Sequence, residues 1–147
     1  MNDKFELLIM GQQFKKLYEK CYDRLMNEYD LKKIDIDVLY FLSHSGKYDT
    51  AKDIASLIFV SKAHVSKSIE NLHKKNLIEL ISDSSDRRYV HIRISQKGQP
   101  VVDEIKLIKE RMNSILFRGI SDEEKNIMLM LTGKIAGNIN EELEKDG

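Results

Sequence analysis

The apolar positions between residues 3 and 29 lie on one helical stripe. They recur at steps of three and four residues, as Leu7, Met10, Phe14, Leu17, Cys21 and Leu25. This spacing puts side chains on one face of an α-helix. The pattern therefore predicts a long amphipathic helix from Asp3 to about Tyr29, in which Cys21 is buried as a small hydrophobe.

Three shorter helices are predicted next, over residues 36–44, 51–59 and 62–75. Each is preceded by a residue whose side chain favours a helix N-cap, namely Asp35, Thr50 and Ser61. A very short strand over residues 48–50 is predicted between the first two helices. In the third helix, Val65, Ile69 and Leu72 form the apolar face, and Asn76 stands at the end, where it tolerates a left-handed backbone.

Two short strands are predicted over residues 77–82 and 89–95. The second alternates apolar and polar side chains, so that Val90, Ile92 and Ile94 face one way and Tyr89, His91 and Arg93 face the other. The loop between the strands reads "DSSDRR". This loop is expected to be flexible, and its acidic residues have no set of partners for catalysis.

Two amphipathic helices complete the pattern. The first is predicted to open at Ser95 to Lys97 and to run to about Phe117, where Gly119 ends it. Ser121 with Glu124 predicts a capping box for the second. The apolar stripe of this last helix comprises Met128, Leu131, Ile135 and Ile139.

Two helices joined by a tight turn and followed by a two-stranded hairpin define a winged helix-turn-helix. The predicted fold is mainly α with a small β wing, an α+β arrangement. Residues 35–98 form the winged lobe, and residues 1–34 and 99–147 form long flanking helices. The apolar stripes of these helices exceed what the lobe can cover, which predicts a two-fold homodimer.

Composition excludes several other classes of protein. The 147 residues are 41% hydrophobic and 33% charged, as expected for a single domain that needs no membrane. One cysteine and the absence of a signal peptide favour the cytoplasm. The histidines have no metal-ligand spacing, and no nucleophile or phosphate-loop motif is present. We therefore expect no enzyme activity, no metal and no cofactor.

The net charge of zero conceals a local basic segment. Residues 61–98 carry 8 basic and 4 acidic side chains, whereas the segments on either side are net acidic. Such an asymmetry favours binding to an anionic polymer. A winged helix-turn-helix inserts the N-terminal half of its second helix into the major groove of DNA.

The candidate DNA-binding residues fall into two groups. Those of the recognition helix are Ser61, Lys62, His64, Ser66 and Lys67, and those of the wing are Asp86, Arg87 and Arg88. Lysines suit phosphates, while serine and histidine suit base edges. Arginine at a wing tip suits a narrow minor groove, and Asp86 is placed to hold Arg88 in one rotamer. The alternatives are a solvated helix face and a solvated turn.

The sequence resembles the multiple-antibiotic-resistance regulator (MarR) family. In "DRRYVHIRISQKG", the residues Asp86, Arg88 and Gly98 match the family pattern Asp-x-Arg, strand, Leu-Thr-x-x-Gly, with Ile94 for leucine and Ser95 for threonine. The segment "DIASLIFVSKAHVSKSIENLHKKNLI" is similar to the helix-turn-helix of the family, and has asparagine where the usual glycine precedes "LI".

The resemblance implies a homodimeric transcriptional regulator that binds a palindromic operator in double-stranded DNA. It implies that Arg88 enters the minor groove, steadied by Asp86 and accompanied by Arg87. It also implies release by a small aromatic effector held between the DNA-binding lobe and the dimerisation helices, and we expect a repressor. Two alternatives stay open: a winged-helix module that binds an acidic protein, and a thiol-based redox regulator that uses Cys21.

Overall fold

The computed structural model of the protein describes residues 3–145. Residues 1, 2, 146 and 147, at the outer ends of the two segments predicted to dimerise, lie outside the described range. The chain divides into two compact units, residues 1–112 and residues 113–147. The predicted fold class is confirmed, because the described residues are mainly helical with one small antiparallel sheet. No helix among them has the length and apolar character needed to cross a membrane.

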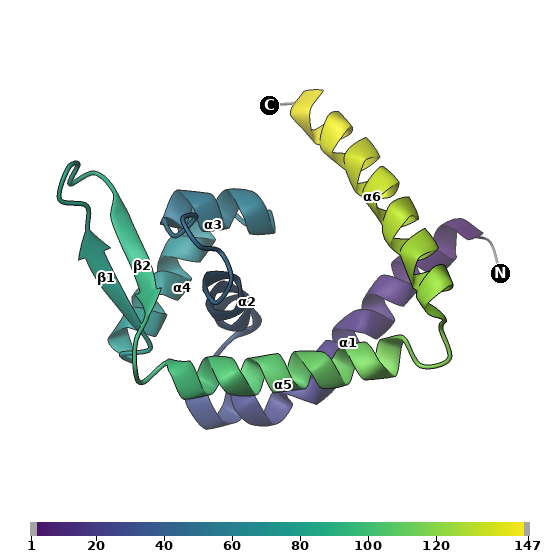
Figure 1. Cartoon of the computed structure of the whole chain (residues 1–147), viewed down its shortest axis with the longest axis horizontal. Helices are drawn as coiled ribbons and strands as arrows, with labels where there is room; N and C mark the ends of the chain where they lie inside the picture. The colour runs from purple at the N-terminus through teal and green to yellow at the C-terminus, as the bar shows by residue number, and fades with distance from the viewer. Residues whose placement is uncertain (1–2, 146–147) are drawn as a thin grey trace. The chain divides into compact units, whose positions relative to one another are not determined.

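The first unit contains the winged helix-turn-helix, a long helix that precedes it in the chain and another that follows it (Figure 1). Its elements are α1 (Asp3–Tyr29), α2 (Lys33–Leu42), α3 (Ala51–Ile58), α4 (Lys62–Lys74), β1 (Ile78–Ser82), β2 (Val90–Ile94) and most of α5 (Gln99–Leu116). Helices α2, α3 and α4 gather beside the hairpin, and α5 runs along α1 (Figure 1). The hydroxyl of Tyr22 in α1 donates to the carbonyl of Ile105 in α5 at 3.5 Å.

Capping side chains set the starts of two helices, as predicted. Thr50 accepts a hydrogen bond from the Asp53 amide, and the Asp53 carboxylate accepts one from the Thr50 amide. Ser61 accepts from the His64 amide at 3.2 Å. Each side chain satisfies a backbone donor that the first turn leaves without a partner.

Asp35 has a different place from the one predicted. Helix α2 starts at Lys33, and Asp35 lies in its first turn rather than before it. Its carboxylate is 1% exposed and accepts hydrogen bonds from the Lys32 amide, the Ser68 hydroxyl and the Asn71 amide group. A buried carboxylate needs such donors. Asp35 therefore joins α2 to α4, which local sequence could not reveal.

The predicted strand over residues 48–50 is absent from the described chain. The sheet has only β1 and β2, paired antiparallel with Ile78 opposite Ile94 and Ser82 opposite Val90. The segment nevertheless lies along β2, because the Ile92 amide donates to the Asp49 carbonyl at 2.9 Å. One bond of this kind fixes the segment at the sheet edge but is too little to make a strand.

Helix α5 starts later than predicted, at Gln99 rather than between Ser95 and Lys97. The Ser95 hydroxyl accepts from the Gly98 amide and donates to the Asn76 carbonyl. Asn76 itself has a φ of 63°, the left-handed backbone predicted for it. Ser95 therefore pins the end of the wing to the turn that follows α4.

The core of the first unit includes residues of the lobe and of the flanking helix α5. The fully buried apolar side chains include Val38, Leu39, Ile54, Val65, Leu72 and Val102. Each such side chain stabilises the fold by about 1.5–3 kcal/mol relative to exposure. Val65 and Leu72 put one face of α4 into this core, and the opposite face is left to solvent.

The second unit contains the end of α5 and helix α6 (Asp122–Lys145). Gly119 has a φ of 76°, which ends α5 as predicted, because glycine adopts a left-handed backbone without steric cost. The predicted capping box is present: the Ser121 amide donates to the Glu124 carboxylate, and the Glu124 amide donates to the Ser121 hydroxyl. None of the α6 residues is buried within the chain.

Candidate nucleic-acid interface

The N-terminal half of α4 presents a polar, cationic face to solvent. Lys62, His64, Ser66 and Lys67 are all exposed, whereas Val65 on the other face is completely buried. The helical period of 3.6 residues separates the two sets. The predicted recognition residues therefore share one accessible surface, except that the Ser61 hydroxyl also caps the helix.

The turn before α4 has a defined conformation. Phe59 ends α3 in the left-handed region, with a φ of 57°, and its amide donates to the Ala55 carbonyl. Val60 is half-buried and Ser61 is extended. A left-handed residue without a glycine is uncommon. The turn directs α4 away from α3, and the Phe59 ring is left 71% exposed.

The wing loop is held by its own acidic residue. One oxygen of Asp83 accepts hydrogen bonds from the Ser85 amide, the Ser85 hydroxyl and the Asp86 amide, at 2.8, 2.6 and 3.3 Å. The Asp83 amide donates to the Tyr89 carbonyl and closes the loop. Asp83 therefore holds together a loop that the sequence predicted to be flexible. Hydrogen bonds from Ser85 and then His91 hold the pKa of Asp83 well below its usual range.

The predicted pairing of Asp86 with Arg88 is present. The Arg88 Nε donates to Asp86 Oδ1 at 3.0 Å, and Nη2 donates to Oδ2 at 2.7 Å. The Arg88 amide also donates to Oδ1. These bonds lower the pKa of Asp86 and raise that of Arg88. A two-point ion pair restricts the rotamers of a side chain that is otherwise 84% exposed.

Arg87 is exposed and makes no hydrogen bond or ion pair with another described residue. The structure thus brings Asp86 and Arg88 into direct contact and leaves Arg87 free beside them. The α4 residues lie on a separate element of the same unit. Contact of both groups with one duplex stays a prediction.

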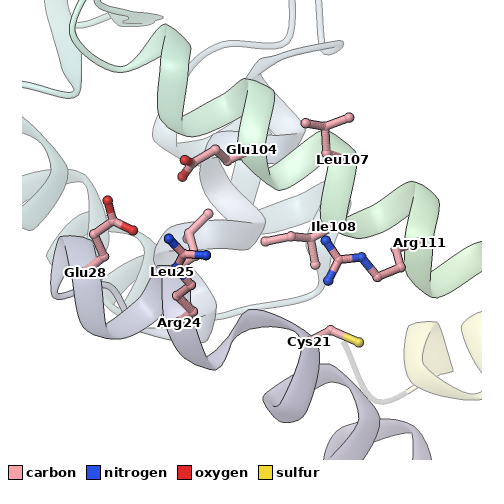
Figure 2. Close-up of a pocket in the computed structure, with 8 residues that line it drawn as sticks. All are labelled: Cys21, Arg24, Leu25, Glu28, Glu104, Leu107, Ile108 and Arg111. Carbon is pink, nitrogen blue, oxygen red and sulfur yellow. The ribbon is translucent and has the colours of Figure 1, made fainter.

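Cys21 lies in a cleft rather than in the core, as Figure 2 shows. The thiol is half-buried, so the prediction of a buried cysteine is wrong. The cleft, of about 230 Å³, lies between α1 and α5 and is lined by Cys21, Arg24, Leu25, Glu28, Glu104, Leu107, Ile108 and Arg111. The guanidinium groups of Arg24 and Arg111 point into it (Figure 2). The reactivity of Cys21 stays a prediction.

Sequence reasoning missed His91, which contacts two carboxylates. Nδ1 lies 2.6 Å from Asp49 and Nε2 lies 3.0 Å from Asp83. The hydrogen bonds to Asp49 and then to Asp83 raise the pKa of His91 above its usual value. The two nitrogens face different carboxylates, and no described group of three such residues has the arrangement of a metal site. The alternation of apolar and polar residues along β2 correctly predicted the sheet face on which His91 lies. It did not predict the partners of His91.

The fold and the exposed surface define a winged helix-turn-helix protein. Residues 29–88, which include all of the helix-turn-helix and the wing loop, match the model described as MarR family. The HTH-type transcriptional regulator YwaE of Bacillus subtilis (strain 168), itself described as uncharacterized, is 29% identical over 125 residues, which are 85% of this chain and 72% of YwaE. Over this segment the chain is similar to the MarR family of transcriptional regulators, in agreement with the resemblance in the sequence.

Solved structures agree on the fold. A MarR protein from Peptoclostridium difficile superposes with a TM-score of 0.83 at 22% identity, covering 96% of this chain and 92% of its own. The S. aureus MepR–DNA complex gives a TM-score of 0.78, also at 22% identity, covering 94% and 98%. Both share the fold over nearly the whole chain. The sequence similarity to the MarR model and to YwaE points to a transcriptional regulator.

Proposed function

We propose that the protein is a homodimeric, sequence-specific regulator that binds a palindromic operator and represses transcription until a small ligand releases it. Residues 35–98 act as the DNA-binding lobe, and residues 1–34 and 99–147 as the dimerisation helices. The observation that carries the proposal is the wing loop, in which Asp86 orients an exposed arginine beside a second, unpaired one. A purely structural turn gains little from two adjacent like charges.

The exposed face of α4 supports the same function. Lys62 and Lys67 are suited to phosphates, and His64, Ser61 and Ser66 to base edges in the major groove. Arg88 would enter the adjacent minor groove, with Arg87 at the backbone. The S. aureus MepR complex, which shares the fold, was solved with DNA.

The dimer rests on apolar surface that the chain does not cover. In α1, Leu7, Met10 and Phe14 are exposed along one face. In α6, exposed apolar side chains extend along the helix, as Ile127, Leu131, Ile135, Ile139 and Leu143. Apolar surface of this extent is rare on a monomer. A second copy is the simplest cover, and a two-fold axis would set two α4 helices about one DNA turn, or ~34 Å, apart.

Ile135→Glu is expected to give a monomer that binds the operator at least about a hundredfold more weakly, because the two half-sites no longer act together. Ile135 is 46% exposed, so the charge does not enter the core of the chain. Sedimentation velocity measures the dimer, and fluorescence anisotropy measures the affinity.

The matched control is Asn126→Glu. Asn126 is exposed and lies about two and a half turns before Ile135, on the opposite side of α6. The control should remain dimeric. A dimeric Ile135→Glu protein with the affinity of the parent would contradict the assignment of α6 to the interface.

Operator affinity is expected to fall steeply with salt. If each copy uses Lys62, Lys67 and Arg87 on phosphates, the dimer makes about six such contacts, and affinity should drop about a thousandfold between ~50 and ~200 mM salt. Anisotropy titrations against DNA flanking the gene check this. A protein that binds no duplex but forms a stable complex with an acidic protein would be the interaction module instead.

Two clefts support the ligand-release part of the proposal. One lies between the lobe and α5, has a volume of about 500 Å³ and includes Arg93 and Lys106 in its lining. The other is the cleft with Arg24 and Arg111 (Figure 2). None of these cations forms an ion pair with a described residue. Each cleft thus offers charged partners for the carboxylate of an aromatic acid.

A further inference from the structure

His91 is the residue at which the wing meets the segment that leads into α3. It lies on β2, on the sheet face opposite the core residue Ile92. Nδ1 is 2.6 Å from an Asp49 oxygen, and Nε2 is 3.0 Å from Asp83 Oδ2. Asp49 directly precedes the N-cap of α3, and Asp83 opens the wing loop. The imidazole therefore bridges two segments that are 34 residues apart in the chain.

The geometry specifies the charge of the bridge. An ionised carboxylate only accepts hydrogen bonds, and a neutral imidazole has a single N–H to donate. Both contacts can be donated together only when both ring nitrogens carry a proton. The bridging form of His91 is thus the imidazolium cation between two anions, and the loss of one proton removes one of the two bonds.

The bridge continues to the wing arginine through hydrogen bonds. Asp83 uses Oδ2 for His91 and Oδ1 for the Ser85 and Asp86 amides. Asp86 in turn holds the Arg88 guanidinium at two points. The hydrogen bonds therefore form a continuous path from Asp49 to Arg88. Of the side chains on this path, only that of His91 titrates near neutral pH.

Other groups on this sheet face do not substitute for the bridge. The cross-strand neighbour of His91 is Ile81, which is uncharged. The next pair toward the base of the hairpin is Glu79 opposite Arg93. Asp49 is held at the sheet edge by its own backbone, through the Ile92 amide. The base of the wing is thus fixed by backbone bonds, whereas the link between its loop and Asp49 depends on the side chain of His91.

We propose that His91, as an imidazolium held between Asp49 and Asp83, is a positioning residue that fixes the wing loop relative to α3 and so makes operator affinity depend on pH. The inference rests on the proposed DNA-binding function. The raised pKa of His91 determines the direction in which operator affinity changes with pH. The bridge is complete below the ordinary histidine pKa and is lost as pH rises through the raised value. When the bridge is lost, the wing loop is fixed relative to α3 in a smaller fraction of the molecules. The apparent affinity for the operator falls in proportion to that fraction.

The first test follows the His91 ring by NMR, without DNA. In the parent protein, both ring nitrogens should be protonated at neutral pH. Asp49→Asn, which removes the charge and keeps the shape, should move the titration of His91 to lower pH, and Asp83→Asn should do the same. A His91 ring that titrates in the parent at the ordinary histidine pKa would overturn the proposal.

The second test measures operator affinity from about pH 6 to about pH 8.5, the range in which histidine titrates. The affinity of the parent should fall across this range, by at most about tenfold per pH unit for each linked proton. His91→Gln should bind about tenfold more weakly than the parent at the acidic end and vary less with pH. Asp49→Asn should behave similarly, with melting temperatures recorded for each variant.

His44→Gln is the matched control, because His44 is exposed at the end of α2 and contacts only its neighbours. It should keep the affinity and pH dependence of the parent, and His64 and His73 remain in every variant. Equal affinity and equal pH dependence in His91→Gln and the parent would overturn the positioning role. A parent protein that binds no operator would instead overturn the proposed function, and the ring titration would then decide the bridge alone.

Discussion

Arg88→Ala is expected to weaken operator binding by at least about thirtyfold, since a dimer loses two groove contacts of about 1–3 kcal/mol each. The side chain is 84% exposed and its only partner among residues 3–145 is Asp86, so the melting temperature should barely change. Exposed ion pairs of this kind contribute about 0–1 kcal/mol. Anisotropy with operator DNA and a thermal melt in the same buffer measure the two effects.

Two further variants separate charge from geometry at this position. Arg88→Lys keeps the charge but lacks the planar fork, and it should recover only part of the affinity. Asp86→Asn keeps Arg88 and weakens its orientation, and it should cost less than Arg88→Ala. Arg118→Ala, at an exposed arginine outside the lobe, should bind like the parent. If the Arg88→Ala protein also binds the operator like the parent, Arg88 does not contact the operator.

Local sequence signals predicted most of the fold because they act within a few residues. The Thr50 and Ser61 caps and the Ser121–Glu124 capping box each close over one helical turn. Asn76 and Gly119 adopt the backbone that their residue types favour. Asp86 and Arg88 are two residues apart, so their pairing also follows from sequence.

Contacts between distant segments could not be predicted in this way. Asp35 has the residue type of an N-cap, but its donors Ser68 and Asn71 come from α4, more than thirty residues later. His91 pairs with Asp49 across 42 residues. The apolar stripe of α1 predicted a buried Cys21, whereas α5 leaves a cleft beside it. In each case the partner is set by how elements pack, and no residue pattern within one element reports it.

The wing end of the family pattern, Ile94-Ser95-x-x-Gly98, has a packing explanation. Leu77, the first residue after the α4 turn, offers its carbonyl to the Ser95 amide at 3.0 Å. The Ser95 hydroxyl binds the carbonyl of Asn76 and the amide of Gly98. Gly98 is thereby drawn against the Leu77 backbone, and a Cβ at this position would overlap the Leu77 carbonyl oxygen.

Gly98→Ala is therefore expected to destabilise the fold by about 2–4 kcal/mol, in the range of substitutions that force a backbone to move. The obstacle is a carbonyl rather than a flexible side chain, so relief requires the separation of β2 from the α4 turn. The wing would be displaced, and operator affinity should fall together with stability. Urea unfolding followed by circular dichroism measures the free energy of unfolding.

Gly137→Ala gives the matched control, because a Cβ at Gly137 meets nothing within 4 Å and the residue lies inside α6. There the added methyl removes backbone freedom from the unfolded chain and should stabilise the helix by about 0.5–1 kcal/mol. The same substitution is thus expected to destabilise the protein at Gly98 and to stabilise it at Gly137, because only Gly98 lacks room for a methyl group. A Gly98→Ala protein as stable as the parent would show that the wing and the α4 turn can separate freely, and that the glycine of the pattern is not required for packing.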